Sequence, residues 1–386
     1  VPPKPSSIIF FKSPNVRFLS SNGCAICPYA PPISNNSFRL GFKTFFVTMF
    51  SRIIFLISSL IFSSFLDFGF SGPSKYFFDN IFSFSFSSFT TTSDKSSDSC
   101  KVIIFTILSG LGFGLFIFLG LGLPNVTGWA AFYLFFLAYG FSLLGLLSST
   151  FHLGNPQRFL KAFSQWRTSW LSREGVISVS TLILIAPFAI GKIFFQVDYA
   201  LLGVLCSGLA LLTIICTSMI YGQLKTVPRW NNYFTPILFV LYSLGGGAII
   251  ASEIKLASYI LIISGFIQIF SWKTGDKSFN KSGSNIKTAT GLGQIGDVRL
   301  LEGPHSGTNY LLKEMVYIIG RKHSQRLRII GFLFVGLLPG LILLSIPINI
   351  ITLILTLVIH LIGVTVIRWL FFAEAEHVVG LYYSMR

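Results

Sequence analysis

The sequence predicts an all-α integral membrane protein, a bundle of eight transmembrane helices preceded by a low-complexity N-terminal extension. The chain of 386 residues is 52% hydrophobic and only 11% charged, with a mean hydropathy of +0.73. Soluble domains carry about 25% charged residues. From Lys101 onward, apolar runs recur at close to the roughly 20 residues that a helix needs to cross a bilayer. Lys and Arg gather in the polar segments between these runs, as is typical of membrane proteins.

The expected spans are read as helices, because a backbone in lipid must satisfy its own hydrogen bonds. They lie near residues 102–123, 128–150, 175–195, 199–220, 233–252, 256–272, 329–347 and 350–372. With eight spans, the longer links 151–174, 221–232 and 273–328 all fall on one side of the membrane. These links carry sixteen Lys and Arg, so the positive-inside bias predicts that they and both ends of the core are cytoplasmic. An acidic partner docked on that face would weaken this argument about orientation.

Residues 1–100 differ in character from residues 101–386, which predicts two parts: an extension and a membrane domain. The first part is crowded with Phe and Ser, as in residues 82–89, and contains one short apolar stretch at 53–66. That stretch is compatible with a signal peptide or an extra helix. The interpretation we favour is that the segment does not belong to the native protein and reflects a mis-assigned start.

The composition also excludes several functions. The formal net charge is +16, but the basic residues lie in links between apolar runs, so nucleic-acid binding is not expected. Cys24 and Cys27 have the spacing of half a metal site, but no second pair follows, so no metal is predicted. Cys206 and Cys216 lie in an apolar run, where a thiol behaves as a small hydrophobic group. Only His360 lies deep within a span, which argues against a haem in this chain.

The link 151–174 is the densest polar segment of the core. His152 ends the second predicted span and Glu174 opens the third, so hairpin geometry places both at the membrane boundary. Such a pair is able to take protons from a hydroquinone whose head group lies at that depth. The alternatives are that His152 caps the second helix, that Glu174 caps the third, and that Arg158 is an ordinary basic anchor.

A second polar group follows the last span, at Arg368, Glu374, Glu376 and His377. It is compatible with a proton route or the wall of a site, although a solvated helix end is slightly favoured. Gly245–Gly247 and Pro339 are candidate helix breaks, which is a feature of transporters.

Several of these stretches resemble the dimethyl sulfoxide reductase anchor subunit family, DmsC, over residues 101–386. The resemblance is carried by residues 151–158 (Phe-His-Leu-Gly-Asn-Pro-Gln-Arg), 170–175, 226–230, 309–315 and 372–379. It implies an eight-helix anchor without its own redox metal or haem, in the bacterial inner membrane. Its partners would be an iron–sulfur electron-transfer subunit and a molybdopterin catalytic subunit, and its bound substrate would be menaquinol in anaerobic electron transport.

By the same resemblance, His152, Arg158 and Glu174 form the quinol pocket. We expect His152 to accept a proton, Glu174 to relay protons and Arg158 to orient the head group. Electrons would pass to the iron–sulfur subunit, docked mainly on the 273–328 loop, so the chain would not itself hold the catalytic centre. The alternatives are the anchor of a polysulfide or tetrathionate-type reductase, an anchor without a quinol site, and a small-solute transporter.

Overall fold

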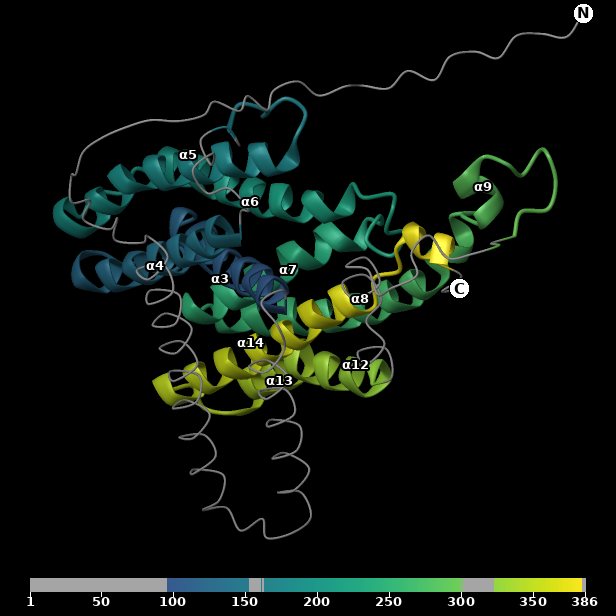
Figure 1. The fold of residues 1–386 in the computed structure, drawn as a ribbon. Coiled ribbons are helices and arrows are strands. Elements are labelled where there is room, and N and C mark those ends of the chain that lie inside the picture. The colour runs from purple at the N-terminus through teal and green to yellow at the C-terminus, as the bar shows by residue number, and fades with distance from the viewer. Residues whose placement is uncertain (1–95, 153–160, 162, 300, 302–322, 384–386) are drawn as a thin grey trace, which may run out of the picture. The chain divides into compact units, whose positions relative to one another are not determined.

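The computed structural model describes residues 96–152, 161, 163–299, 301 and 323–383. The expected N-terminal extension up to residue 95, with Cys24 and Cys27, lies outside these residues, as does Arg158. All regular structure in the described residues is helical, which confirms the predicted all-α class (Figure 1). The α-helices are α3 (Ser96–Gly120), α4 (Gly128–His152), α5 (Trp170–Ile190), α6 (Ala200–Gly222), α7 (Phe234–Ile250), α8 (Ile254–Lys281), α9 (Ile286–Thr290), α12 (Ser324–Phe332), α13 (Leu338–Ser345) and α14 (Ile350–Ala373).

Two π-helical segments extend these elements. Gly191–Phe195 continues α5, and Leu333–Leu337 joins α12 to α13 into one continuous helical segment. A short 3₁₀ helix, Val378–Tyr383, follows α14. The predicted break at Pro339 therefore corresponds to a change of helix type, because Pro339 lies in the first turn of α13 directly after the π-helical segment.

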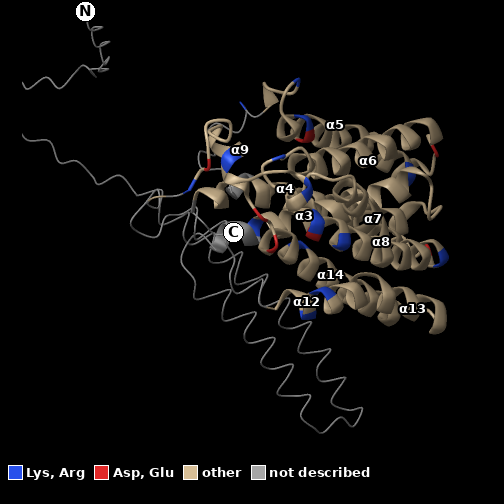
Figure 2. Ribbon diagram, turned by 90° about the vertical axis from the view of Figure 1, so that its right-hand side faces the viewer, with Lys and Arg blue, Asp and Glu red and all other residues tan. Residues whose placement is uncertain are grey.

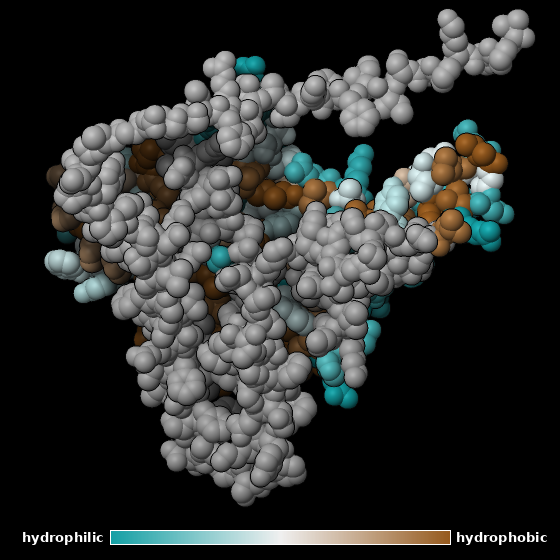
Figure 3. All heavy atoms as spheres, in the orientation of Figure 1, coloured by the Kyte–Doolittle hydropathy of each residue, from teal (hydrophilic) through white to brown (hydrophobic). Residues whose placement is uncertain are grey.

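Within the described ranges, seven helical segments are long and apolar enough to cross a membrane. They coincide with seven of the predicted runs and comprise α3, α4, α5 with its π-helical extension, α6, α8, α12–α13 and α14. The eighth run, 233–252, coincides with α7, which has only 17 residues. Large apolar side chains such as Leu201, Phe194 and Ile351 face outward, and brown residues cover much of the described surface visible in Figure 3.

Several helices differ from their predicted boundaries, and two of these differences concern polar residues. The third span begins at Trp170, so Glu174 lies in the second turn of α5 and not at the opening of the helix. Helix α8 continues from the predicted end at residue 272 to Lys281. The prediction marked where the apolar run stops, whereas the helix continues through polar residues that include Asp276, which pairs with two arginines.

Helix α3 is the centre of the bundle. In its membrane-length window 78% of the residues are buried, against at most 44% in the other candidate spans. It packs against α4, α6 and α7, and it also contacts α14. Helix α5 packs mainly against α6, and α8 packs against α7, so these outer helices are connected to α3 through its direct neighbours.

Glycines allow α3 and α7 to approach until their backbones touch. A Cβ atom added at Gly114 would lie 2.0 Å from the Ser243 carbonyl oxygen, and one at Gly247 would lie 2.4 Å from the Gly114 carbonyl carbon. Small residues at such contacts are typical of helix packing in membranes. The predicted break at Gly245–Gly247 is absent, because α7 is continuous from Phe234 to Ile250. Gly247 instead allows the close packing of α7 against α3.

Ion pairs mark the two ends of the bundle, and Figure 2 shows Lys and Arg concentrated towards the helix ends. At one end, Lys192 is buried and its Nζ donates to Asp198 Oδ2 at 2.7 Å and to Asn125 Oδ1 at 3.2 Å. These contacts join the α3–α4 and α5–α6 connections. The longer connections lie at the opposite end, where a larger ion-pair network is found.

The close contact between α3 and α7 predicts a sharp difference between two Gly→Ala substitutions. Gly114→Ala forces the two backbones apart and should destabilise the protein by about 3 kcal/mol. Gly208→Ala on α6 is the matched control, because a Cβ there meets nothing within 4 Å. Thermal unfolding of both variants in mild detergent measures the difference. Equal stability of the two variants would contradict the packing.

Candidate functional site

Glu174 is a buried carboxyl group in a membrane-length helix. Its residue is 4% exposed, and the Thr217 hydroxyl on α6 donates a hydrogen bond to Glu174 Oε1. Among the described residues, no Lys or Arg lies within ion-pair distance of this carboxyl group. The N-cap of α5 is Ser169, so Glu174 does not cap its helix. The carboxyl group instead lies between α5 and α6.

The other two residues of the predicted quinol pocket are placed only in part. His152 is the last residue of α4, as predicted, but its side chain and the whole of Arg158 lie outside what the structure describes. Convergence of the three side chains stays a prediction. Arg173 on α5 stabilises the end of the link between α4 and α5. Its guanidinium donates hydrogen bonds to the carbonyl oxygens of Trp166 at 3.0 Å and Arg167 at 2.7 Å.

Four charged residues form an ion-pair network at the end of the bundle where the longer connections lie. Arg328 binds both Asp276 oxygens, at 2.7 and 2.8 Å, and its Nε donates to Glu374 Oε1 at 2.7 Å. Arg229 Nη2 lies 2.5 Å from Asp276 Oδ1, and its Nη1 lies 3.5 Å from Glu374 Oε2. The network joins the α6–α7 connection to the ends of α8, α12 and α14. Glu374 is buried, so its interpretation as part of a solvated helix end is wrong.

The network also brings together two stretches that are far apart in the sequence, 226–230 and 371–378. The Trp230 indole donates to the Phe371 carbonyl at 2.8 Å and stacks on the Phe371 ring, with centroids 4.9 Å apart. The Val378 amide donates to the Thr226 carbonyl at 3.0 Å. These stretches thus form one structural unit, whereas the sequence analysis named them only as separate stretches.

The sequence reasoning did not single out Asp276 or Arg328. The available signal was that Asp276 interrupts a basic stretch, between Lys273 and Lys277. An isolated carboxylate there needed a cationic partner, but the sequence did not indicate which one. His360, in contrast, was noted as the deep histidine, and its ring nitrogens lie 2.7 Å from Val335 O and 3.3 Å from Tyr242 O. Its contacts tie α14 to α7 and to the second π-helical segment.

Tyr221 lies at the end of α6, the helix that also carries Thr217, the hydrogen-bond partner of Glu174. The Tyr221 ring packs edge-on against Trp230 and Phe371, with centroid distances of 5.6 Å in both cases. An aromatic cluster thus joins the end of α6 to the α6–α7 connection and to α14.

These features define a helical membrane subunit with polar groups gathered at one end of its bundle. The family model of the DMSO reductase anchor subunit (DmsC) matches residues 96–373. The chain belongs to this family, and it is therefore a membrane anchor of a molybdoenzyme-type oxidoreductase complex that contains catalytic and electron-transfer subunits.

Two curated relatives agree with this assignment. A sulfite dehydrogenase subunit from Allochromatium vinosum is 30% identical over 271 residues, which cover 63% of this chain and 82% of the relative. The anaerobic dimethyl sulfoxide reductase chain YnfH of Escherichia coli is 28% identical over 128 residues, which cover 30% of this chain and 42% of the relative. No solved structure matches the chain.

The ion-pair network predicts unequal effects of removing its two carboxylates. Glu374→Gln leaves the half-buried Arg328 and Arg229 without their buried partner and should destabilise the protein by about 3 kcal/mol. The Asp276 side chain is 45% exposed, so Asp276→Asn should cost about 1 kcal/mol because water replaces much of the lost interaction. Thermal unfolding of the two variants in detergent tests this order. A larger loss for Asp276→Asn would contradict this arrangement of the network.

Proposed function

We propose that the chain binds menaquinol at the boundary between α4 and α5, oxidises it, and passes the electrons to an iron–sulfur partner subunit. His152 accepts a hydroxyl proton, Glu174 relays protons, and Arg158 orients the head group. The iron–sulfur subunit then passes these electrons to a molybdopterin catalytic subunit. The chain itself contributes binding and proton transfer, and the redox centres lie on the partners.

One observation carries this proposal: Glu174 is buried in a membrane-length helix with a hydroxyl group as its partner and no counter-charge in the described residues. A carboxyl group in such a place is costly to keep charged, and ionisable residues inside membranes are typically functional. Thr217 fixes the position of one oxygen and leaves the other for proton exchange. A purely structural role would be better served by an uncharged residue.

The proposal includes eight spans, with α7 as the eighth. The Arg229–Asp276 ion pair joins the connection before α7 to the end of α8. If α8 crosses the membrane and ends there, α7 must have crossed in the opposite direction. At about 1.5 Å per residue a 17-residue helix is about 25 Å long, slightly less than the roughly 30 Å hydrocarbon core. Both ends of the core then lie on the side of the basic loops, proposed as the cytoplasmic side of a bacterial inner membrane.

A second possibility concerns the direction of electron flow. The relative with the longer match is named as part of a dehydrogenase, whereas the other is named as a chain of a reductase. In a dehydrogenase complex, the same pocket would bind quinone and take electrons from the partner. Polysulfide and tetrathionate are further candidate substrates, because the catalytic partner selects the substrate. The two directions can be separated with the purified complex. Reduced quinone and oxidised quinone are added in separate assays, and the form that is consumed shows the direction of electron flow.

The quinol site predicts a selective kinetic defect in Glu174→Gln. Glutamine keeps the size of the side chain and a partner for Thr217, but it cannot exchange a proton. The quinol-dependent rate should therefore fall about 100-fold, while a reduced dye that feeds the partner subunits directly should support the normal rate. His152→Gln should behave in the same way.

Glu253→Gln is the matched control, because this carboxylate belongs to the N-cap residue of α8, in the short α7–α8 connection away from the proposed pocket and the longer loops. It should leave the quinol-dependent rate unchanged. Full quinol oxidation in both Glu174→Gln and His152→Gln would refute the proposed pocket. The chain would then be an anchor without a quinol site of its own.

A further inference from the structure

A second uncompensated charge lies beneath the ion-pair network, at Arg368 on α14. The residue is 4% exposed, and its Nε has no hydrogen-bond partner. Its guanidinium carbon lies 3.3 Å from the centroid of the Phe239 ring and 5.8 Å from that of Tyr242. No carboxylate in the described part of the chain pairs with it. The aromatic contacts only partly replace a counter-ion, so an anion is the missing partner.

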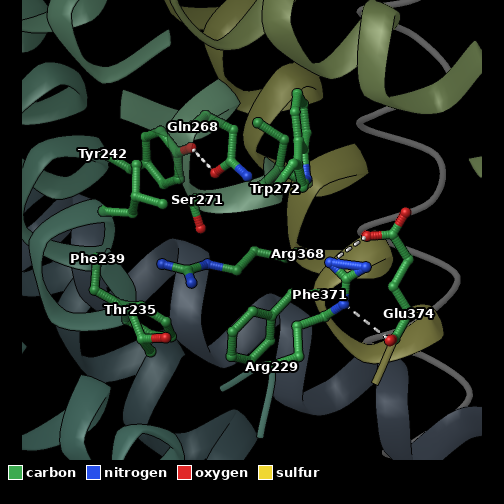
Figure 4. Close-up of a pocket in the computed structure, with 12 residues that line it drawn as sticks. Arg229, Thr235, Phe239, Tyr242, Gln268, Ser271, Trp272, Arg368, Phe371 and Glu374 are labelled. Atoms are coloured by element: carbon green, nitrogen blue, oxygen red, sulfur yellow. Dashed lines mark hydrogen bonds and ion pairs between the residues drawn. The ribbon is translucent and has the colours of Figure 1, made fainter. Parts of the chain in front are cut away.

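Arg368 reaches into a cavity between α7, α8 and α14, which also borders Arg229 and Glu374 (Figure 4). Across the cavity lie Gln268 and Ser271 of α8. The Tyr242 hydroxyl donates to Gln268 Oε1 at 2.5 Å, so the amide NH₂ is the end of Gln268 left to donate. The cavity thus offers a guanidinium, an amide NH₂ and a hydroxyl group.

The charges around the cavity do not balance. Arg229, Arg368 and Glu374 line the cavity, and Arg328 and Asp276 complete the adjoining ion-pair network, which gives three positive and two negative charges. Both carboxylates are already paired with Arg229 and Arg328. The excess positive charge is therefore that of Arg368, and it is directed at the donors of α8. A guanidinium fork in this setting matches the oxygens of a phosphate or carboxylate group.

The size of the cavity restricts the ligand. It encloses about 40 Å³, which is room for about three water molecules. That space suits one tetrahedral oxyanion group and is too small for a quinone ring. The cavity is thus separate in both chemistry and position from the proposed quinol pocket on α5.

We propose that the cavity between α7, α8 and α14 binds a single phosphate group through Arg368, Gln268 and Ser271. The phosphate belongs either to the head group of an anionic phospholipid or to free inorganic phosphate. The site lies about one and a half helix turns from the end of α14, at a depth that a lipid head group reaches from the membrane boundary. Binding would neutralise Arg368 and tie α8 to α14.

The test uses the full chain, purified in a sugar detergent with any subunits that accompany it. Native mass spectrometry measures retention of phosphatidylglycerol against a neutral glycolipid with the same acyl chains. Thermal unfolding measures stabilisation by phosphatidylglycerol and, separately, by inorganic phosphate. Arg368→Gln should weaken binding about tenfold or more. The control is Arg326→Gln, which removes the same charge from an exposed position on α12 and should change nothing.

Arg368→Gln also loses an aromatic contact, so poor folding of this variant would weaken phosphate binding as well. A second variant, Ser271→Ala, tests the site independently of such a folding defect. Ser271→Ala deletes one donor without altering charge, and it should weaken binding severalfold in a folded protein. Binding of phosphatidylglycerol alone identifies a lipid head group, and stabilisation by inorganic phosphate identifies a free anion; either supports the site. The proposal is overturned if neither probe binds, or if Arg368→Gln and Ser271→Ala bind like the unmodified chain.

Discussion

Charges placed near the hydrocarbon core have to be neutralised inside the protein, and the ion-pair network of Arg229, Asp276, Arg328 and Glu374 meets this requirement. It fixes the α6–α7 connection and the ends of α8, α12 and α14 at one end of the bundle. Lys192 and Asp198 mark the opposite end. These two sets of pairs hold several helix ends together, and the close contact of α3 with α7 joins the backbones of two helices at the centre of the bundle.

Among the described residues, Glu174 and Arg368 are buried and lie outside these ion pairs, and they differ in what they can do. Glu174 can exchange a proton, so its burial beside Thr217 suits a reaction that releases protons. Arg368 keeps its charge, so its cavity suits the binding of an anion. Glu174 lies between α5 and α6, whereas the cavity of Arg368 lies between α7, α8 and α14. The proposed quinol chemistry and the proposed phosphate site therefore occupy different parts of the molecule, and either can fail without the other.

The helices were predictable from the sequence because an apolar run of membrane length can form few structures other than a helix. All eight predicted runs lie on helices. Their ends were less predictable, because α8 continues through Lys273 and Asp276, where hydropathy has already fallen. Glu174 was found as a candidate, but its partner was not, since Thr217 lies within an apolar run that carries no polar signal. The pairing of Asp276 with Arg328 joins residues 52 positions apart, and no local pattern specifies such a partner.

The most direct test of the role in electron transfer is to purify the tagged chain from its membranes in mild detergent, identify the proteins that accompany it, and assay them for iron and molybdenum. We expect an iron–sulfur protein and a molybdopterin protein in fixed proportion to the chain, with clusters that a menaquinol analogue reduces. If the chain emerges alone and free of both metals under several gentle conditions, the role as an anchor for electron transfer is contradicted.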